Sequence, residues 1–211
     1  MAAKGAAELA GIAISGQMHG LVPVEADGEP VRNAILWNDQ RTAVQAAGLS
    51  SHPGDDVLIL RTGNPAITGF QLPKLLWLRE SEPAAFGRTV RALLPKDWLG
   101  HRLTGNFVTE PSDASGTGCF NSRNGDWDDT ILAATGLDRS LFPDVIASVE
   151  QAGTVHGAAA AATGLPEGTK VFAGAGDNAA ANTGLGLSSR KPGLGSLSLG
   201  TSGVVFLPLA S

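Results

Sequence analysis

Cysteine and tyrosine are almost missing from this chain. Among 211 residues there is one cysteine, Cys119, and no tyrosine. A single cysteine excludes an intrachain disulfide and a thiolate metal cluster. The four histidines (His19, His52, His101 and His156) have neither the HxxxH nor the HxH spacing of a histidine metal site. The sequence therefore predicts no metal site built from its own side chains.

Basic blocks and long apolar runs are also absent. The formal net charge is −5 and no lysine- or arginine-rich segment occurs, so we expect no nucleic-acid partner. An anionic ligand would need backbone N–H groups, helix N-termini or a metal. No window is apolar enough to span a bilayer, and the opening MAAKGAAELAG does not resemble a signal peptide. We therefore expect a cytoplasmic α/β protein without a membrane partner.

Glycine is abundant, with 28 residues, and apolar residues make up 43%. This combination favours many tight strand–loop junctions rather than a helical bundle. A first strand is expected over 10–15, and an antiparallel pair over 21–25 and 31–37 that turns at Asp27-Gly28. Asn38-Asp39 then resembles a cap for a helix over 40–47. Further along, the periodicity predicts a short helix within 48–69, helices from Leu72, after Pro95 and over 129–135, and a buried strand over 91–95.

The composition changes near Glu150, where we expect a domain boundary. After it come a strand at GTVH, a small helix, a buried strand over 170–174 and a helix over 176–186. Two strands, LGSLSLG and VVFLPL, then predict a hairpin that turns at 200–203.

The most informative stretch is GAGDNAA, at 174–180. It places Asp177 where an apolar strand ends and a helix begins, which is the usual ligand position in open α/β sheets. An ionised aspartate there could orient a hydroxyl and accept its proton during phosphoryl transfer. The alternative is that Asp177 is simply an N-cap, and in isolation capping is the commoner role.

Three other stretches carry candidate ligand groups. LGTSG, at 199–203, exposes consecutive N–H groups that could wrap a phosphate, although an ordinary hairpin turn has the same composition. WNDQR, at 37–41, mixes flat and bidentate polar groups as sugar sites do, or is only a capped helix start. SGQMHG, at 15–20, places His19 at a strand end, where it is either a ligand or a turn residue.

Six motifs, taken in order, resemble the xylulokinases, which are carbohydrate kinases of the FGGY family: ISGQMHG, ILWNDQR, LPKDWLGHRLTG, TEPSDASGT, GAGDNAA and SLSLGTSG. The resemblance covers about Gly11 to Phe206. It implies an actin-like/ribonuclease H-like two-domain fold with the active site in the cleft. It also implies ATP with Mg²⁺ as cofactors and D-xylulose as the substrate, phosphorylated to D-xylulose 5-phosphate.

The resemblance also implies a role for each matching residue. Asp177 matches the catalytic base, and Met18 and His19 match the pair that contacts the ketopentose. The remaining matches are Gln17 and Asn178 beside that pair, Trp37, Asp39 and Arg41 on the sugar side, and Gly200, Thr201 and Ser202 in the turn that approaches the phosphates.

The family pattern extends beyond this sequence at both ends. No DxGT turn precedes Gly11, and no adenine-binding part follows LGTSG. We therefore interpret 1–149 as a sugar-binding N-terminal domain without its first strands, and 150–211 as the beginning of the ATP-binding domain. Alone, such a chain is expected to be weak or inactive, and an open sheet edge would favour a homodimer or self-association.

Two alternatives to D-xylulose phosphorylation remain at this point. The chain could belong to a kinase of another ketopentose or polyol, such as a ribulose kinase. It could also be a non-catalytic, sugar-binding remnant.

Overall fold

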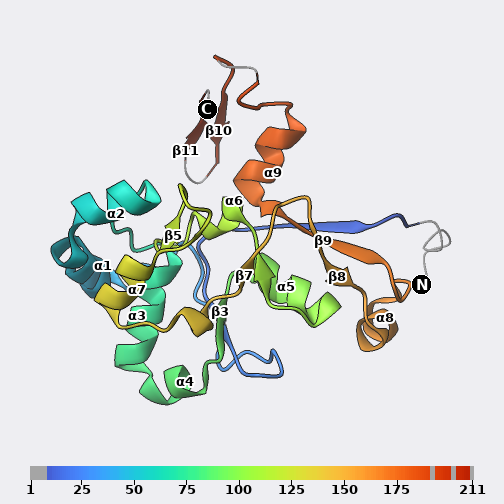
Figure 1. Cartoon of the computed structure of the whole chain (residues 1–211), viewed down its shortest axis with the longest axis horizontal. Helices are drawn as coiled ribbons and strands as arrows, with labels where there is room; N and C mark the ends of the chain where they lie inside the picture. Colours follow the sequence, from blue (N-terminus) through green and yellow to red (C-terminus); the bar gives the residue numbers. More distant parts are fainter. Residues whose placement is uncertain (1–8, 191–192, 201–202, 210–211) are drawn as a thin grey trace.

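A three-stranded sheet forms the centre of the molecule. The computed structural model describes residues 9–190, 193–200 and 203–209. The sheet has the order β1 (Ile12–Gly16), β9 (Lys170–Gly176) and β8 (Gln151–Thr154), with β9 parallel to β1 and antiparallel to β8 (Figure 1). Segments that are about 160 residues apart in the sequence thus lie side by side, and both sides of the predicted boundary contribute to one sheet. The boundary itself stays a prediction.

A β-bulge interrupts the pairing of β1 with β9. The register passes from Ala13↔Phe172 to Ser15↔Ala175, so β9 contains one residue more than β1 over this stretch. Gly174 provides the extra residue with a φ of 78°, which only glycine adopts readily. The bulge turns the end of β9 and helps to direct the residues that follow it.

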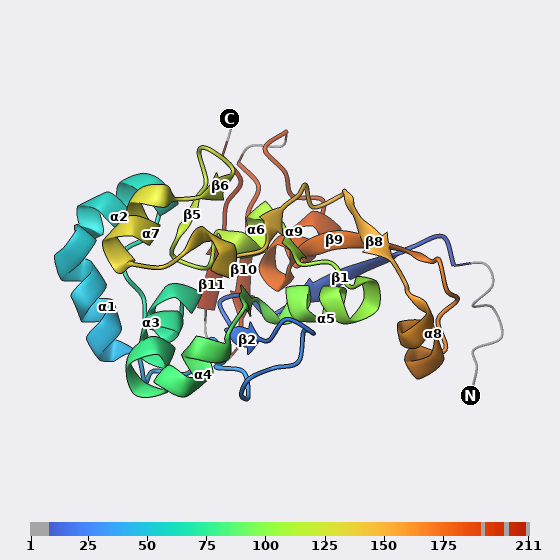
Figure 2. The same ribbon diagram turned by 60° about the horizontal axis from the view of Figure 1, so that its bottom comes forward.

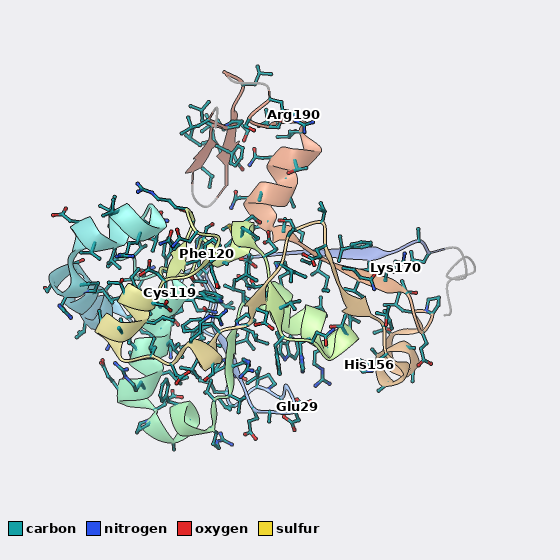
Figure 3. All side chains as sticks on the ribbon, in the orientation of Figure 1. Glu29, Cys119, Phe120, His156, Lys170 and Arg190 are labelled. Atoms are coloured by element: carbon teal, nitrogen blue, oxygen red, sulfur yellow. The ribbon has the colours of Figure 1, made fainter. Side chains whose placement is uncertain are left out.

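Helices pack into a separate layer beside the sheet, on the left in Figure 1. Its elements are α1 (Ala43–Leu49), η2 (Ser50–Gly54), α2 (Asp55–Thr62), α3 (Gln71–Ser81), α4 (Pro83–Arg88), α7 (Asp129–Thr135) and η3 (Arg139–Leu141). Leucines from these helices form the main core together with the aromatic residues Phe120, Trp127 and Phe142, which lie outside them. Cys119 and Phe120 lie within it, fully buried (Figure 3).

The sheet is covered by two further helices. α5 (Pro95–Thr104) lies across β1, β9 and β8, and α8 (Gly157–Thr163) packs beside it (Figure 2). Ile14, Leu103, Val155 and Val171 form the apolar core between them. α5 begins with Pro95 at its first turn and ends at Gly105 in the left-handed conformation, as expected for a helix at this place.

Short strand pairs connect the two layers: β2 (Val22–Val24) with β3 (Arg91–Leu93), β4 (Val108–Thr109) with β7 (Asp144–Val145), and β5 (Phe120–Asn121) with β6 (Asp126–Trp127). α6 (Pro111–Ala114) follows β4 and is capped by the side chain of Glu110.

Two expectations for the region after β1 are wrong in detail. The segment 31–37 forms no regular strand. It lies antiparallel to β2 on the edge opposite β3, but it pairs only through the isolated bridges Leu21↔Ile35 and Val24↔Pro30, and the extra residues on its side between these two bridges interrupt the ladder. The helix predicted over 40–47 begins at Ala43, because Asp39 forms a turn with the N–H of Arg41 instead of capping a helix. The expected short helix within 48–69 is confirmed as α2.

The last elements project away from the sheet. α9 (Asp177–Gly184) follows β9 directly, and β10 (Ser196–Leu199) pairs with β11 (Gly203–Phe206) in the predicted hairpin (Figure 1). Arg190 lies beyond the end of α9 that is remote from the sheet (Figure 3). None of the described helices has the length and apolar character that a membrane span requires.

Candidate functional site

Two parallel strands end side by side and present the candidate residues. Gly16 of β1 is paired with Gly176 of β9, so Gln17 and Asp177 leave the sheet at the same level. Added side-chain carbons at these glycines would meet Lys96 at 3.0 Å and Met18 at 2.9 Å. The glycines thus let both chains turn sharply at the carboxyl edge of the sheet, where α/β proteins usually bind ligands.

A pocket of about 380 Å³ opens at this edge. It is lined by Gln17, Met18, His19, Trp37, Asp177, Asn178, Ser198, Gly200 and Val204. This volume lies in the range of small-molecule sites. A larger hollow, of about 780 Å³, shares Gln17 but contains no carboxylate or histidine in its lining. The smaller pocket is the better candidate because titratable and amide groups converge on it.

His19 is held by its ring and by its backbone. Among the described residues it is the one non-glycine residue with a positive φ, of 70°. Its imidazole stacks on Phe70, with ring centroids 4.7 Å apart and planes 8° from parallel. Its Nδ1 donates a hydrogen bond of 2.7 Å to the carbonyl of Gly116. A backbone in the left-handed region that is held by two neighbours points to a functional position.

The protonation state of His19 follows from this geometry. Burial is the largest effect and lowers the pKa of His19, and the charge of Lys74 lowers it further, against opposing effects of the Gly116 hydrogen bond and of Asp177. The ring is therefore neutral at pH 7. Since Nδ1 carries the hydrogen that Gly116 accepts, Nε2 has a free lone pair and can only accept a hydroxyl hydrogen.

Asp177 is exposed and is the first residue of α9. The N-cap position is Gly176, which rules out the interpretation of Asp177 as the N-cap. Its Oδ1 accepts a hydrogen bond of 2.8 Å from the N–H of Asn178. The positive end of the helix dipole stabilises a carboxylate at this position. One carboxylate oxygen, Oδ2, is left for a ligand.

The predicted sugar-side residues are divided between two places. Trp37 lines the pocket and is 41% exposed. Asp39 and Arg41 form a bidentate ion pair, with Nε–Oδ1 and Nη2–Oδ2 distances of 2.9 and 2.7 Å, and the Arg41 guanidinium lies 4.8 Å from the centre of the Trp77 ring. Neither lines the pocket. A direct role for these two in sugar binding stays a prediction.

The predicted phosphate turn is represented by Gly200, which lines the pocket with Ser198. Thr201 and Ser202 lie outside the described residues.

Sequence reasoning missed a buried group of charges behind the pocket. Lys96 lies 2.6 Å from Asp97, 3.9 Å from Glu110 and 3.8 Å from Asp113, and all four side chains are almost completely buried. Neither carboxyl oxygen of Asp113 has a hydrogen-bond partner. Burial raises the pKa of Asp113 well above its usual value, and the neighbouring Asp97 raises it further. The adjacent charges Lys96-Asp97, directly after an apolar run, were the available signal.

This group is connected to the strand that precedes Asp177. Lys96 Nζ donates to the carbonyl of Ala173 at 3.3 Å. The Ser112 hydroxyl accepts from the N–H of Gly176 at 3.1 Å and donates to Glu110 at 2.8 Å. The buried charges therefore hold the end of β9, which precedes Asp177, from the side away from the pocket.

Metal binding by protein side chains alone finds no support in residues 9–190, 193–200 and 203–209. These ranges contain no group of three or more histidine, cysteine, aspartate or glutamate residues that could hold an ion.

Curated relatives match nearly the whole chain. The xylulose kinase of Streptomyces coelicolor is 46% identical over 207 residues, covering 96% of this chain and 41% of the relative. The xylulose kinase of Lactococcus lactis subsp. lactis is 45% identical over 198 residues, covering 94% and 39%. The chain thus spans about 40% of the length of these relatives.

Solved structures of the same kind share its fold. The xylulose kinase from Rhodospirillum rubrum superposes with a TM-score of 0.86 at 28% identity, covering 92% of this chain and 39% of that one. The expected actin-like/ribonuclease H-like fold, of which this chain has the N-terminal part, is thereby confirmed. Residues 4–184 match the N-terminal domain of the FGGY family of carbohydrate kinases, and the chain belongs to that family.

Proposed function

We propose that this chain provides the sugar-binding residues and the catalytic base of an ATP-dependent kinase that converts D-xylulose to D-xylulose 5-phosphate. The observation that carries the proposal is the convergence of the His19 turn and the Asp177 helix start in one pocket of about 380 Å³. The names of the most similar curated relatives support the choice of substrate.

In this proposal each pocket residue has a distinct task. Asp177 accepts the proton of the sugar hydroxyl as the oxygen attacks the γ-phosphorus of ATP, and ADP leaves with the electrons of the broken bond. His19 Nε2 accepts the hydrogen of a second hydroxyl. The amides of Gln17 and Asn178 can donate and accept with the remaining hydroxyls. Trp37 offers a flat apolar surface to the carbon skeleton.

The phosphates would approach from the β10–β11 hairpin, from which Ser198 and Gly200 line the same pocket as His19 and Asp177. Backbone N–H groups in such a turn can hold phosphate oxygens. Magnesium would enter with the nucleotide, as is common for phosphate-bound Mg²⁺. The described residues offer no cluster of three or more histidine, cysteine, aspartate or glutamate side chains for the ion.

Calorimetry and a turnover assay test the proposal. D-xylulose should bind the wild-type protein and Asp177→Asn with similar affinity, because the amide keeps the shape of the carboxylate. In a full-length kinase that contains this chain, ATP- and xylulose-dependent ADP release should fall about 10²–10⁴-fold in the variant, as expected for the loss of a general base. Full turnover by Asp177→Asn would overturn the assignment of the base.

Substrate choice needs a separate comparison, since a gluconate kinase from Lactobacillus acidophilus has a similar structure, with a TM-score of 0.84 at 26% identity. D-ribulose, gluconate and glycerol should bind at least about tenfold more weakly than D-xylulose, because a mismatched hydroxyl leaves polar groups of the site unpaired. Stronger binding of any of these would assign the protein to another substrate.

A further inference from the structure

Lys74 is a fully buried lysine beneath the pocket. It belongs to α3, within the apolar sequence LPKLLW, and its side chain is 0% exposed. No ion pair in the described part of the chain includes it. A buried ammonium without a carboxylate is costly to fold, so its hydrogen-bond partners indicate why it is there.

Those partners are two backbone carbonyls beside the pocket. Lys74 Nζ donates to the carbonyl of His19 at 2.9 Å and to the carbonyl of Gly69. The residue after Gly69 is Phe70, on which the His19 ring stacks. A Cβ at Gly69 would lie 3.0 Å from the carbonyl of Trp37, so a third pocket segment packs against the same place. One ammonium thus joins the backbone of His19 to the segment whose Phe70 ring stacks on the imidazole.

The charge of Lys74 also acts on the imidazole. It lowers the pKa of His19, as burial does, and favours the neutral ring. Burial lowers the pKa of Lys74 itself to about 8, and the charge of Asp39 opposes that shift. His19 and Asp39 are therefore the titratable groups that face Lys74. Below about pH 8 the lysine is cationic, and between the lowered pKa of His19 and pH 8 a cationic Lys74 stands beside a neutral ring that accepts at Nε2.

We propose that Lys74 is a positioning residue for His19. Its ammonium donates hydrogen bonds to the His19 and Gly69 carbonyls and so holds the imidazole with Nε2 free to accept the hydrogen of a sugar hydroxyl. The sugar part of this inference rests on the proposed function. The effect on the imidazole does not, which allows the two to be tested apart.

The test is a comparison of Lys74→Met with Lys96→Met by ¹⁵N NMR of the His19 ring and by calorimetry with D-xylulose. Methionine keeps the length of the lysine and removes its charge and hydrogens. In Lys74→Met the pKa of His19 should rise, and xylulose should bind about tenfold or more weakly, since hydrogen bonds from a charged donor are lost. Lys96→Met is the matched control: it removes another buried lysine, which contacts neither His19 nor Gly69, and should lower stability while the His19 ring signals stay unchanged.

If Lys74→Met does not fold, a pH titration of the His19 ring signals in the wild-type protein tests the inference instead. The His19 ring signals should show a second inflection near pH 8, where Lys74 loses its proton. Unchanged His19 signals in a folded Lys74→Met would overturn the inference, and so would a wild-type titration in which those signals do not respond when Lys74 loses its proton. If the NMR result holds and no sugar binds, the proposed function fails and the positioning role of Lys74 remains.

Discussion

The imidazole of His19 lies flat on the phenyl ring of Phe70, with centroids 4.7 Å apart and planes within 8° of parallel. Phe70 is 8% exposed and comes directly before α3, so it is anchored by the helical layer. Together with the hydrogen bond from Nδ1 to Gly116, the stack leaves the ring one orientation. The direction of Nε2 is therefore set by residues that are distant in the sequence.

Replacing Phe70 by leucine should weaken sugar binding more than folding. Leucine keeps most of the apolar contact, and the aromatic stack that is lost is worth about 0.5–1.5 kcal/mol. We expect the dissociation constant of D-xylulose to rise roughly two- to tenfold, measured by calorimetry. Phe120→Leu, in the core away from the pocket, should lower the melting temperature and leave the affinity unchanged. Equal affinity of wild type and Phe70→Leu would show that the stack does not orient the ring.

Gly116→Ala should displace the same ring from its other side. An added Cβ would lie 2.5 Å from Nδ1 and 2.7 Å from Cε1 of His19, closer than real contacts allow. His19 or the backbone must move, and we expect xylulose affinity to fall about tenfold or more, as for other displaced polar ligand groups. Gly87→Ala is the control, because its Cβ would meet nothing within 4 Å and helix α4 gains propensity. Similar effects of the two alanines would contradict a role for Gly116 in placing His19.

Local sequence signals predicted most elements of this fold. The helices after Leu72 and Pro95 and over 129–135 were found from periodicity and caps, because their local preferences agree with their packing. The strand expected over 31–37 was wrong in detail because its ladder with β2 is interrupted between two isolated bridges. The pairing of β2 with β3, about 70 residues further along, was not predicted. Pairing partners at such separations are decided by tertiary packing, which a single sequence does not contain.

The site could be predicted only in part. Turn chemistry made His19 and Asp177 candidates, but it fitted a turn residue and an N-cap as well, and the roles of Met18, His19 and Asp177 were assigned from the resemblance to the FGGY kinases; those roles stay predictions. Their supports were missed: Phe70 and Lys74 lie in patterns that a buried helix alone explains. Gly116 was missed because its role depends on a ring 97 residues away.

Asp113→Asn should change how stability depends on pH. Burial raises the pKa of Asp113 well above its usual value, so the folded state holds this proton more tightly than the unfolded state. The stability that the protonated Asp113 contributes is therefore fully present below about pH 4, near the pKa of an aspartate in the unfolded chain. It is lost as pH rises through the pKa of Asp113 in the folded state. The asparagine variant cannot titrate and should lack this loss. The measurement is urea unfolding at intervals from pH 4 to pH 8. The free energy of unfolding of the variant should increase relative to that of wild type as pH rises.

A difference between Asp113→Asn and wild type that stays constant from pH 4 to pH 8 would mean that the Asp113 carboxyl is not the group whose proton is held by folding.

Gly174→Ala tests the bulge that precedes Asp177, with Gly164→Ala as its matched control. Both glycines have left-handed backbones, with φ of 78° and 76°. A Cβ at Gly174 would lie 1.9 Å from the carbonyl oxygen of Ile14, whereas at Gly164 it would meet nothing within 4 Å. Gly164→Ala should therefore cost only the backbone strain, about 1 kcal/mol. Gly174→Ala must in addition push β1 and β9 apart, and should lower the free energy of unfolding by several times that amount in urea titrations.

Because the bulge directs both strand ends toward the pocket, folded Gly174→Ala should also bind xylulose more weakly, while Gly164→Ala binds it normally. Equal losses of stability in the two variants would show that the close approach of β1 and β9 at Gly174 is relieved at no cost, and that the bulge does not fix the position of Asp177.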